Sequence, residues 1–263
     1  METAIFILIG IIGLVIGSFL NVLIYRVPEG KSIAWPASHC PNCDQPLKWR
    51  DNVPLLSFII LRGKCRSCGQ PISWQYPLVE LSAAVISIMA LLKFDLSSAF
   101  LAAAFFMLVL LTVAVIDLQR QIIPNRIIIP AMIFSAAVAL FTALIGRDFL
   151  PVAGRTSLLM AAVGFAAGGG LLLLVAVIRP GGMGGGDIKL AGFMGIFLGP
   201  YVIMALFIGF LLGSLAGLTS IILLHKSRRD LLPFGPFLSF GAILTLFFGG
   251  AILKWYLGLS GMG

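Results

Sequence analysis

Charged residues are scarce in this chain. They make up 11% of its 263 residues, less than half of the roughly 25% that is usual in soluble globular proteins. A soluble fold of this size could not cover its surface with so few charges, so the composition excludes a soluble enzyme. The 60% share of hydrophobic residues excludes intrinsic disorder. Only four cysteines are present in a chain of this length, which excludes a small disulfide-stapled secreted protein.

Long apolar runs take the place of the missing charges, and the mean hydropathy is +1.09. A helix needs about 20 mainly apolar residues to cross roughly 30 Å of hydrocarbon. Eight runs are candidates, at about 4–25, 77–93, 98–116, 127–145, 156–178, 188–200, 201–224 and 234–257. The sequence therefore predicts an all-α polytopic membrane protein with about eight transmembrane helices. The run 188–200 is short, so a re-entrant or offset helix is the alternative there.

The basic residues indicate the orientation in the membrane. With eight spans and the N-terminus outside, 14 Lys and Arg fall on the cytoplasmic side and four outside. If the run 188–200 turned back, the ratio would be 12 to six. The net charge of +8 is thus explained by topology in the lipid, and we expect no nucleic-acid partner. The basic cluster at 225–229 is interpreted as a topology anchor on the same side.

This pattern predicts three regions. Residues 1–25 form a first transmembrane helix, and residues 26–76 form the one polar, cytoplasmic domain. Residues 77–263 form a seven-helix membrane core.

All four cysteines lie in the polar region, as the pairs Cys40/Cys43 and Cys65/Cys68 with 21 residues between them. Two such Cys-x-x-Cys turns are typical of a tetrahedral four-thiolate zinc site. The reducing cytoplasm disfavours disulfides, and four sulfur ligands leave no open position, so we expect one structural zinc ion. Redox-active or unliganded turns are the alternative. His39 adjoins Cys40, but four thiolates already complete the shell.

Two aspartates stand at the ends of apolar runs, Asp117 after one and Asp187 before another, and the topology places both at the cytoplasmic face. Ionisable groups at such places are functional candidates. Two carboxylates brought together can share one proton and activate water, as in aspartic proteases. The glycines at 181–186 would allow close approach of an extended peptide. A solvated helix end and a helix cap are the alternatives for the two residues.

We expect most other polar residues of the spans to contribute to helix packing. Glu80, near the start of a span, is either a helix-start packing residue or a functional acid. Ser18 and Asn21 are interpreted as hydrogen-bonding partners of a neighbouring helix, and the glycines 168–170 as a site of close helix packing.

Several segments together resemble the bacterial type IV prepilin peptidases, and the resemblance covers nearly the whole chain. The matching segments are Gly17–Val22 with Tyr25–Arg26, Leu61–Cys68, Tyr76–Glu80, Asp117 with Ile123–Asn125, Gly184–Asp187 (a GxGD motif) and Pro233–Phe237.

The resemblance implies a bifunctional leader peptidase and N-methyltransferase of the bacterial inner membrane. Asp117 and Asp187 would be the catalytic pair, and the four cysteines the zinc ligands. Prepilins or pseudopilins would be cleaved after glycine at the cytoplasmic face, and S-adenosylmethionine would methylate the new N-terminus, usually phenylalanine. Gly63 and Lys64 are the candidates for binding this methyl donor, against a plain turn and a solvated lysine.

Two other classes of protein remain as alternatives. One is an eight-span membrane transporter with interfacial acidic residues. Transporters usually have acids near the bilayer midplane and two similar halves, whereas the acids of this sequence stand at one interface and the zinc-loop half is not repeated. A membrane scaffold that recruits partners through the zinc loop would not need Asp117 and Asp187.

Overall fold

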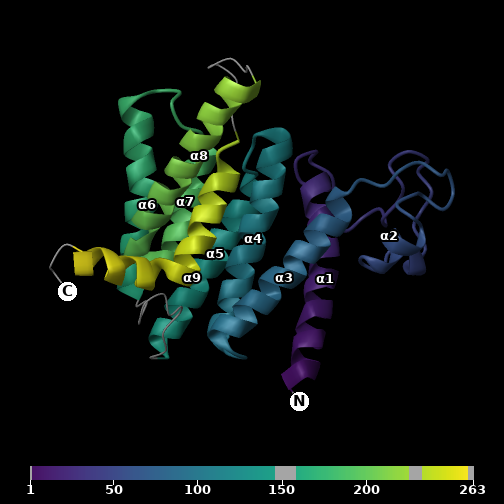
Figure 1. The fold of residues 1–263 in the computed structure, drawn as a ribbon, viewed down its shortest axis with the longest axis horizontal. Helices are drawn as coiled ribbons and strands as arrows, with labels where there is room; N and C mark the ends of the chain where they lie inside the picture. Colours follow the sequence, from purple (N-terminus) through teal and green to yellow (C-terminus); the bar gives the residue numbers. More distant parts are fainter. Residues whose placement is uncertain (1, 146–157, 225–232, 260–263) are drawn as a thin grey trace. The chain divides into compact units, whose positions relative to one another are not determined.

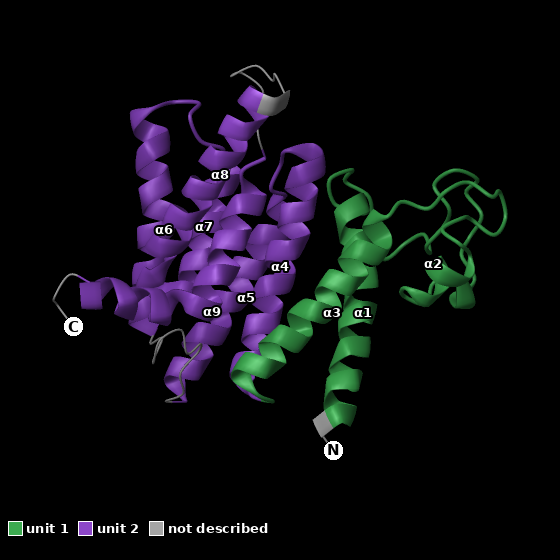
Figure 2. Cartoon of the chain, viewed as in Figure 1, with its two compact units in different colours: residues 1–96 green, residues 97–263 purple. Residues whose placement is uncertain are grey.

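The computed structural model describes residues 2–145, 158–224 and 233–259, and these residues form helices, turns and loops with no strand. The chain divides into two compact units, residues 1–96 and 97–263 (Figure 2). The prediction of an all-α membrane fold is confirmed. The basic cluster at 225–229 lies outside the described residues.

The first unit is built on two long helices, α1 (Glu2–Arg26) and α3 (Gln75–Phe94) (Figure 1). They approach closely at glycines of α1. A Cβ atom on Gly13 would lie 2.6 Å from the Cα of Ala84, and one on Gly17 would lie 2.6 Å from the Cα of Glu80. Small residues allow this contact, which supplies van der Waals packing where lipid removes the hydrophobic driving force.

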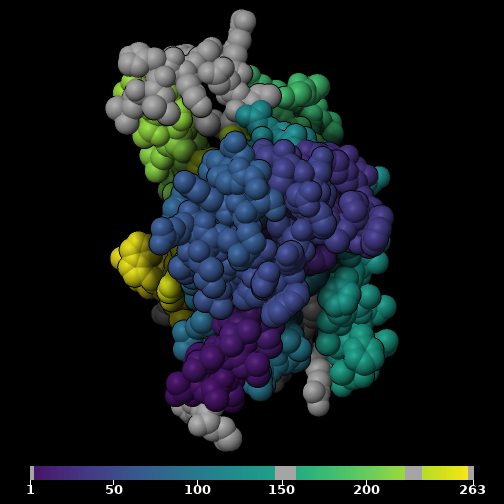
Figure 3. All heavy atoms as spheres, turned by 90° about the vertical axis from the view of Figure 1, so that its right-hand side faces the viewer, coloured from purple at the N-terminus to yellow at the C-terminus, as the bar shows by residue number. Residues whose placement is uncertain are grey.

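The segment between α1 and α3, residues 27–74, is the polar loop of the first unit. It contains a 3₁₀ turn η1 (Trp49–Asp51) and a short helix α2 (Leu56–Ile60). Figure 3 shows the atoms of this loop, coloured violet to blue, as one continuous lobe.

The second unit is a bundle of helices, and its core contains a ring cluster in which Phe106 stacks on Phe197 and Phe193 meets Phe197 edge to face. Close pairs within it are α6 with α7, α8 with α9, and α4 with α9. Its elements are α4 (Ser98–Arg120), α5 (Asn125–Leu144), α6 (Leu158–Ile178), α7 (Gly185–Leu198), the 3₁₀ turn η2 (Gly199–Tyr201), α8 (Val202–Leu224) and α9 (Gly235–Leu259).

Seven candidate spans follow from helix length and composition in the described residues, where the sequence predicted about eight. The difference lies at Gly185–Ile222, which counts as one candidate of 38 residues although it holds both α7 and α8. The chain reverses there, as the surroundings of Gly168 in α6 show. A Cβ on Gly168 would lie 2.5 Å from Ala191 O of α7 and 2.9 Å from a methyl group of Val202 in α8, so both helices pass the same point of α6. With 14 residues, α7 is about 21 Å long, which is shorter than the hydrocarbon core.

Helix α6 contacts the α7–α8 hairpin through its glycines. A Cβ on Gly164 would overlap the backbone of Gly195 and lie 2.6 Å from the Cα of Gly199. The expected close packing at 168–170 holds for Gly168, whereas a Cβ on Gly170 would meet nothing within 4 Å. The two backbones therefore touch at one face of α6 only.

We expect Gly164→Ala to destabilise the protein by about 1–3 kcal/mol, the usual cost of overpacking, because the new methyl group has only backbone to displace. Gly170→Ala is the matched control in the same helix and should be neutral or slightly stabilising. Thermal unfolding in one detergent, followed by tryptophan fluorescence, measures both. Equal midpoints for Gly164→Ala and Gly170→Ala would contradict the described contact.

Candidate functional site

Asp117 lies in the last turn of α4 with its side chain buried. The helix ends just beyond it, where Gln121 adopts a left-handed conformation and its N–H donates to Asp117 O at 2.8 Å. The Asp117 carboxylate accepts a hydrogen bond at Oδ2 from Gly235 N, also at 2.8 Å. A hydrogen bond to a charged group contributes about 1.5–3 kcal/mol, so this contact fixes the buried carboxylate.

The first residue of α9 has to be a glycine for this contact. A Cβ on Gly235 would lie 2.9 Å from Asp117 Oδ2 and 3.2 Å from its Cγ. The segment Pro233–Phe237 contributed to the family resemblance, but sequence reasoning gave no role to Gly235. The only available signal was a glycine between two prolines at the start of an apolar run.

Asp187 lies in the first turn of α7 and is half-buried. Its carboxylate lies against the helix N-terminus, since a Cβ on Gly184 would be 2.9 Å from Asp187 Oδ2. Gly186 packs on the Ile123 side chain, which a Cβ there would approach to 2.7 Å. Two residues after Asp187, Lys189 Nζ donates to Asn125 Oδ1 at 2.7 Å.

These contacts bring the two sequence motifs together. The glycine-rich turn before α7 lies on the segment that connects α4 to α5, only a few residues after Asp117. Ile123, six residues after Asp117, thereby contacts Gly186, the residue before Asp187. The structure thus gathers both carboxylates at the end of the bundle where α4 ends and α7 and α9 begin. Such a pair is able to exchange protons with a bound water and a substrate carbonyl.

The four cysteine sulfurs form a second cluster, in the loop of the first unit. All four Sγ atoms lie within 4.8 Å of one another, and the Cys40 and Cys68 sulfurs are 3.9 Å apart. A tetrahedral zinc site with Zn–S distances of about 2.3 Å has sulfur–sulfur edges of about 3.8 Å. The cluster therefore has the size and donor set of a four-thiolate metal site.

The two cysteine turns share one backbone fold. Cys40 N donates to Gln45 O at 3.0 Å, and Cys65 N donates to Gln70 O at 2.8 Å. Each turn ends in a left-handed residue and is closed by an isolated bridge, His39–Pro46 in one and Lys64–Pro71 in the other. The shared pattern Cys-x-x-Cys-x-Gln-Pro was visible in the sequence and was missed as a repeat.

The surroundings of the sulfurs favour negative charge on one thiol and oppose it on another. Backbone N–H groups of Cys68 and Ser67 lower the pKa of Cys65 to about 6. For Cys43, a backbone hydrogen bond from Gln45 favours the thiolate, but burial and the three neighbouring sulfurs raise its pKa to about 12. Four thiolates this close together need a cation to neutralise them.

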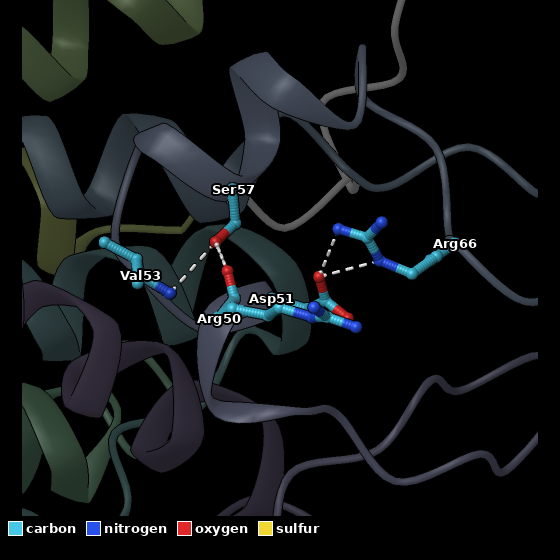
Figure 4. A network of polar contacts seen from close by, with 5 residues as sticks. All are labelled: Arg50, Asp51, Val53, Ser57 and Arg66. Carbon is cyan, nitrogen blue, oxygen red and sulfur yellow. Dashed lines mark hydrogen bonds and ion pairs between the residues drawn. The ribbon is translucent and has the colours of Figure 1, made fainter.

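A polar network holds the second cysteine turn against the rest of the loop (Figure 4). Arg66 donates to Asp51 Oδ1 from Nε at 2.9 Å and from Nη2 at 2.7 Å, and only 7% of the Asp51 side chain is exposed. Ser57 of α2 accepts from Val53 N at 2.9 Å and donates to Arg50 O at 3.0 Å. The network links the cysteine turn, η1 and α2.

The remaining candidates have structural contacts. Gly63 has a φ of +67°, its N–H donates to Phe58 O, and its carbonyl accepts from Ile72 N. Lys64 is exposed. Glu80 accepts from Leu55 N at 2.9 Å.

The predicted helix–helix hydrogen bond of Asn21 is present in the first unit. Asn21 Nδ2 of α1 donates to Tyr76 O of α3 at 3.1 Å.

Two family profiles match the chain. The profile described as "Bacterial Peptidase A24 N-terminal domain" matches residues 11–94, and the "Type IV leader peptidase family" matches residues 104–222.

Curated relatives match over nearly the whole length. A "Prepilin leader peptidase/N-methyltransferase" of Bacillus subtilis is 36% identical over 251 residues, which cover 95% of this chain and 97% of the relative. A protein with the same description from Aeromonas hydrophila is 32% identical, with 96% and 93% covered. A "Type 4 prepilin-like proteins leader peptide-processing enzyme" of Escherichia coli is 35% identical, with 89% and 91% covered. No solved structure matches the chain.

We expect the purified protein to contain one metal ion per chain and Cys40→Ser to lose most of it, because three sulfurs bind far more weakly than four. Ser67→Ala changes a residue between two ligands without removing a sulfur, so it should keep the metal. Elemental analysis of detergent-purified protein measures the content. Wild-type levels in Cys40→Ser would contradict the four-sulfur site.

Proposed function

The chain belongs to the type IV leader peptidase family, and we propose that it is a prepilin leader peptidase/N-methyltransferase with Asp117 and Asp187 as its catalytic pair. The observation that carries this proposal is the hydrogen bond that holds the buried Asp117 carboxylate at the junction where α7 begins, with Asp187 in its first turn. Family membership removes the reason to consider a transporter or a scaffold.

In the proposed mechanism the two carboxylates share one proton. The ionised carboxylate takes a proton from a water molecule, whose oxygen attacks the carbonyl carbon of the scissile peptide bond. The protonated partner donates its hydrogen to the carbonyl oxygen. When the tetrahedral intermediate collapses, the C–N bond breaks and the leaving amine takes the proton of the carboxyl that had received it from water. One hydroxyl of the intermediate returns its proton to the other carboxylate, which restores the shared-proton pair. Gly235 N holds one oxygen of Asp117, which leaves the other for these transfers.

We propose that the four-cysteine cluster binds a zinc ion with a structural role. Four sulfur donors at tetrahedral spacing fit zinc and leave no position for water or substrate. The ion would join Cys40 and Cys43 to Cys65 and Cys68, and so tie two turns of a loop that has little core of its own. Its binding free energy would then contribute directly to the folding of the loop.

For the methyl transfer we propose S-adenosylmethionine as the donor, in keeping with the N-methyltransferase in the relatives' names. The donor would supply the methyl group for the new α-amine. Both backbone groups of Gly63 are already hydrogen-bonded within the loop. The Lys64 side chain is exposed and is able to contact the donor.

We further propose that the protein lies in the bacterial inner membrane with the zinc loop and the catalytic pair at the cytoplasmic face. The excess of basic residues on that side supports this orientation. The functional division is then a first helix at 1–25, a zinc domain at 26–76 and a peptidase core at 77–263. Prepilins and pseudopilins would be cleaved after glycine, and the new N-terminal residue methylated.

We expect Asp117→Asn and Asp187→Asn each to abolish cleavage, because an amide can neither accept nor share the proton. Asp95→Asn is the matched control, since it makes the same change at an exposed acid of the α3–α4 turn. Mass spectrometry of a prepilin incubated with each variant, with and without S-adenosylmethionine, resolves cleavage from methylation. Cleavage by either catalytic variant at the wild-type rate would refute the pair. The thermal unfolding midpoint of each variant shows whether a loss of cleavage comes from the chemistry or from the fold.

We expect Gly235→Ala to slow cleavage at least tenfold, because its Cβ would displace the Asp117 carboxylate, and displacements of about 1 Å cost up to about 100-fold in rate. Gly258→Ala is the control in the same helix, where a Cβ would meet nothing within 4 Å. The rate at saturating prepilin is the measurement, and equal rates for the two variants would contradict the role of Gly235.

A further inference from the structure

One face of α2 consists of large apolar side chains that the described residues leave uncovered. Leu56, Ile59 and Ile60 are 57%, 68% and 70% exposed and follow the i, i+3, i+4 spacing of a single helix face. Ser57 is buried and bonded within the loop. Three tryptophans of the same loop are also highly exposed, namely Trp35, Trp49 and Trp74. Grouped apolar exposure of this kind marks an interaction surface.

Two contacts set the depth of α2 relative to the membrane helix α3. Leu55, the residue before α2, donates its N–H to Glu80, which lies about 7.5 Å along the α3 axis from Gln75. Phe58 of α2 packs on Trp74, the residue that precedes α3, with ring centroids 4.9 Å apart. These contacts hold α2 beside the first turns of α3 instead of beyond its end, at the level where a membrane helix enters the lipid headgroups.

The charge of the loop matches an anionic surface. Residues 27–74 hold six basic and three acidic side chains. Glu29 is paired with Lys31 and Asp51 with Arg66. The basic residues outside these pairs are all exposed, namely Lys48, Arg50, Arg62 and Lys64. Basic residues near a membrane helix bind anionic headgroups, and tryptophan concentrates at the same interface.

We propose that the zinc loop docks on the bilayer, with the Leu56/Ile59/Ile60 face of α2 inserted at the headgroup boundary and the exposed basic residues on anionic lipid. A helix with such an apolar face and a basic surround lies in the plane of the interface. The metal cluster and its polar network would hold the loop rigid, so that the face presented to lipid stays formed. Docking would keep the loop close to the membrane plane, where the family's substrates are processed.

The test uses the full chain in lipid nanodiscs. Trp255 is the one tryptophan outside the loop, so Trp255→Phe leaves Trp35, Trp49 and Trp74 as reporters. Phosphatidylcholine brominated near the headgroup should quench their fluorescence, and phosphatidylglycerol should increase the quenching. High salt should reverse that increase. Equal quenching in neutral and anionic discs, or none in either, would overturn the proposal.

Two double variants and one control identify the residues that contact lipid. Ile59→Ser with Ile60→Ser should remove most of the quenching. Lys48→Gln with Arg62→Gln should lower the docked-to-undocked ratio roughly fivefold for each charge removed. Ile33→Ser changes an exposed loop isoleucine outside α2 and should have no effect. Metal content confirms that each variant is folded. If α2 were covered by protein instead, hydrogen exchange at 56–60 would be as slow in detergent as in anionic discs, and docking on lipid would be excluded.

Discussion

A single hydrogen bond between a buried carboxylate and a backbone N–H organises the candidate active site. Asp117 ends α4 and Gly235 begins α9, and these residues are far apart in the chain. A buried carboxylate needs a partner, and a helix N-terminus supplies one in its unpaired N–H groups and the positive end of its dipole. The contact requires a glycine at 235, because a Cβ there would meet the Asp117 carboxylate. The Asp117 side chain and the missing side chain of Gly235 together define where α4 and α9 meet. The position of Asp117 beside Asp187 depends on that meeting.

The two functional clusters rest on different physics. The carboxylates are held by helices whose backbones touch at glycines, in a setting where lipid offers no hydrophobic drive for association. The cysteines are held by two short turns of the same design, with little apolar core around them, so that the proposed metal ion would contribute its binding free energy to the folding of the loop. The glycines of α6 allow helix backbones to touch, and the cysteine turns bring four sulfurs within 4.8 Å of one another. Ordinary side-chain packing would produce neither close approach.

Glu80 shows how a membrane-helix acid can have a structural use. Its carboxylate accepts from Leu55 N, while its backbone lies under Gly17 of α1. It thus joins the loop to both helices of the first unit and sets the level of α2. The proposed docking of the apolar face of α2 and of the basic loop depends on this anchor. On a freely extended loop the same residues would have no defined depth relative to the membrane helix α3.

Local chemistry determined much of this protein from sequence. Apolar runs match the observed helices within a few residues, because a span has to satisfy its own backbone hydrogen bonds. The Cys-x-x-Cys pairs indicated a metal cluster, because each short turn brings its own two sulfurs together. Contacts between segments distant in the chain were decided by the tertiary structure alone. The reversal at Gly199, the bond from Gly235 to Asp117 and the anchoring of α2 on Glu80 each join residues whose proximity follows from helix packing, which no local pattern encodes.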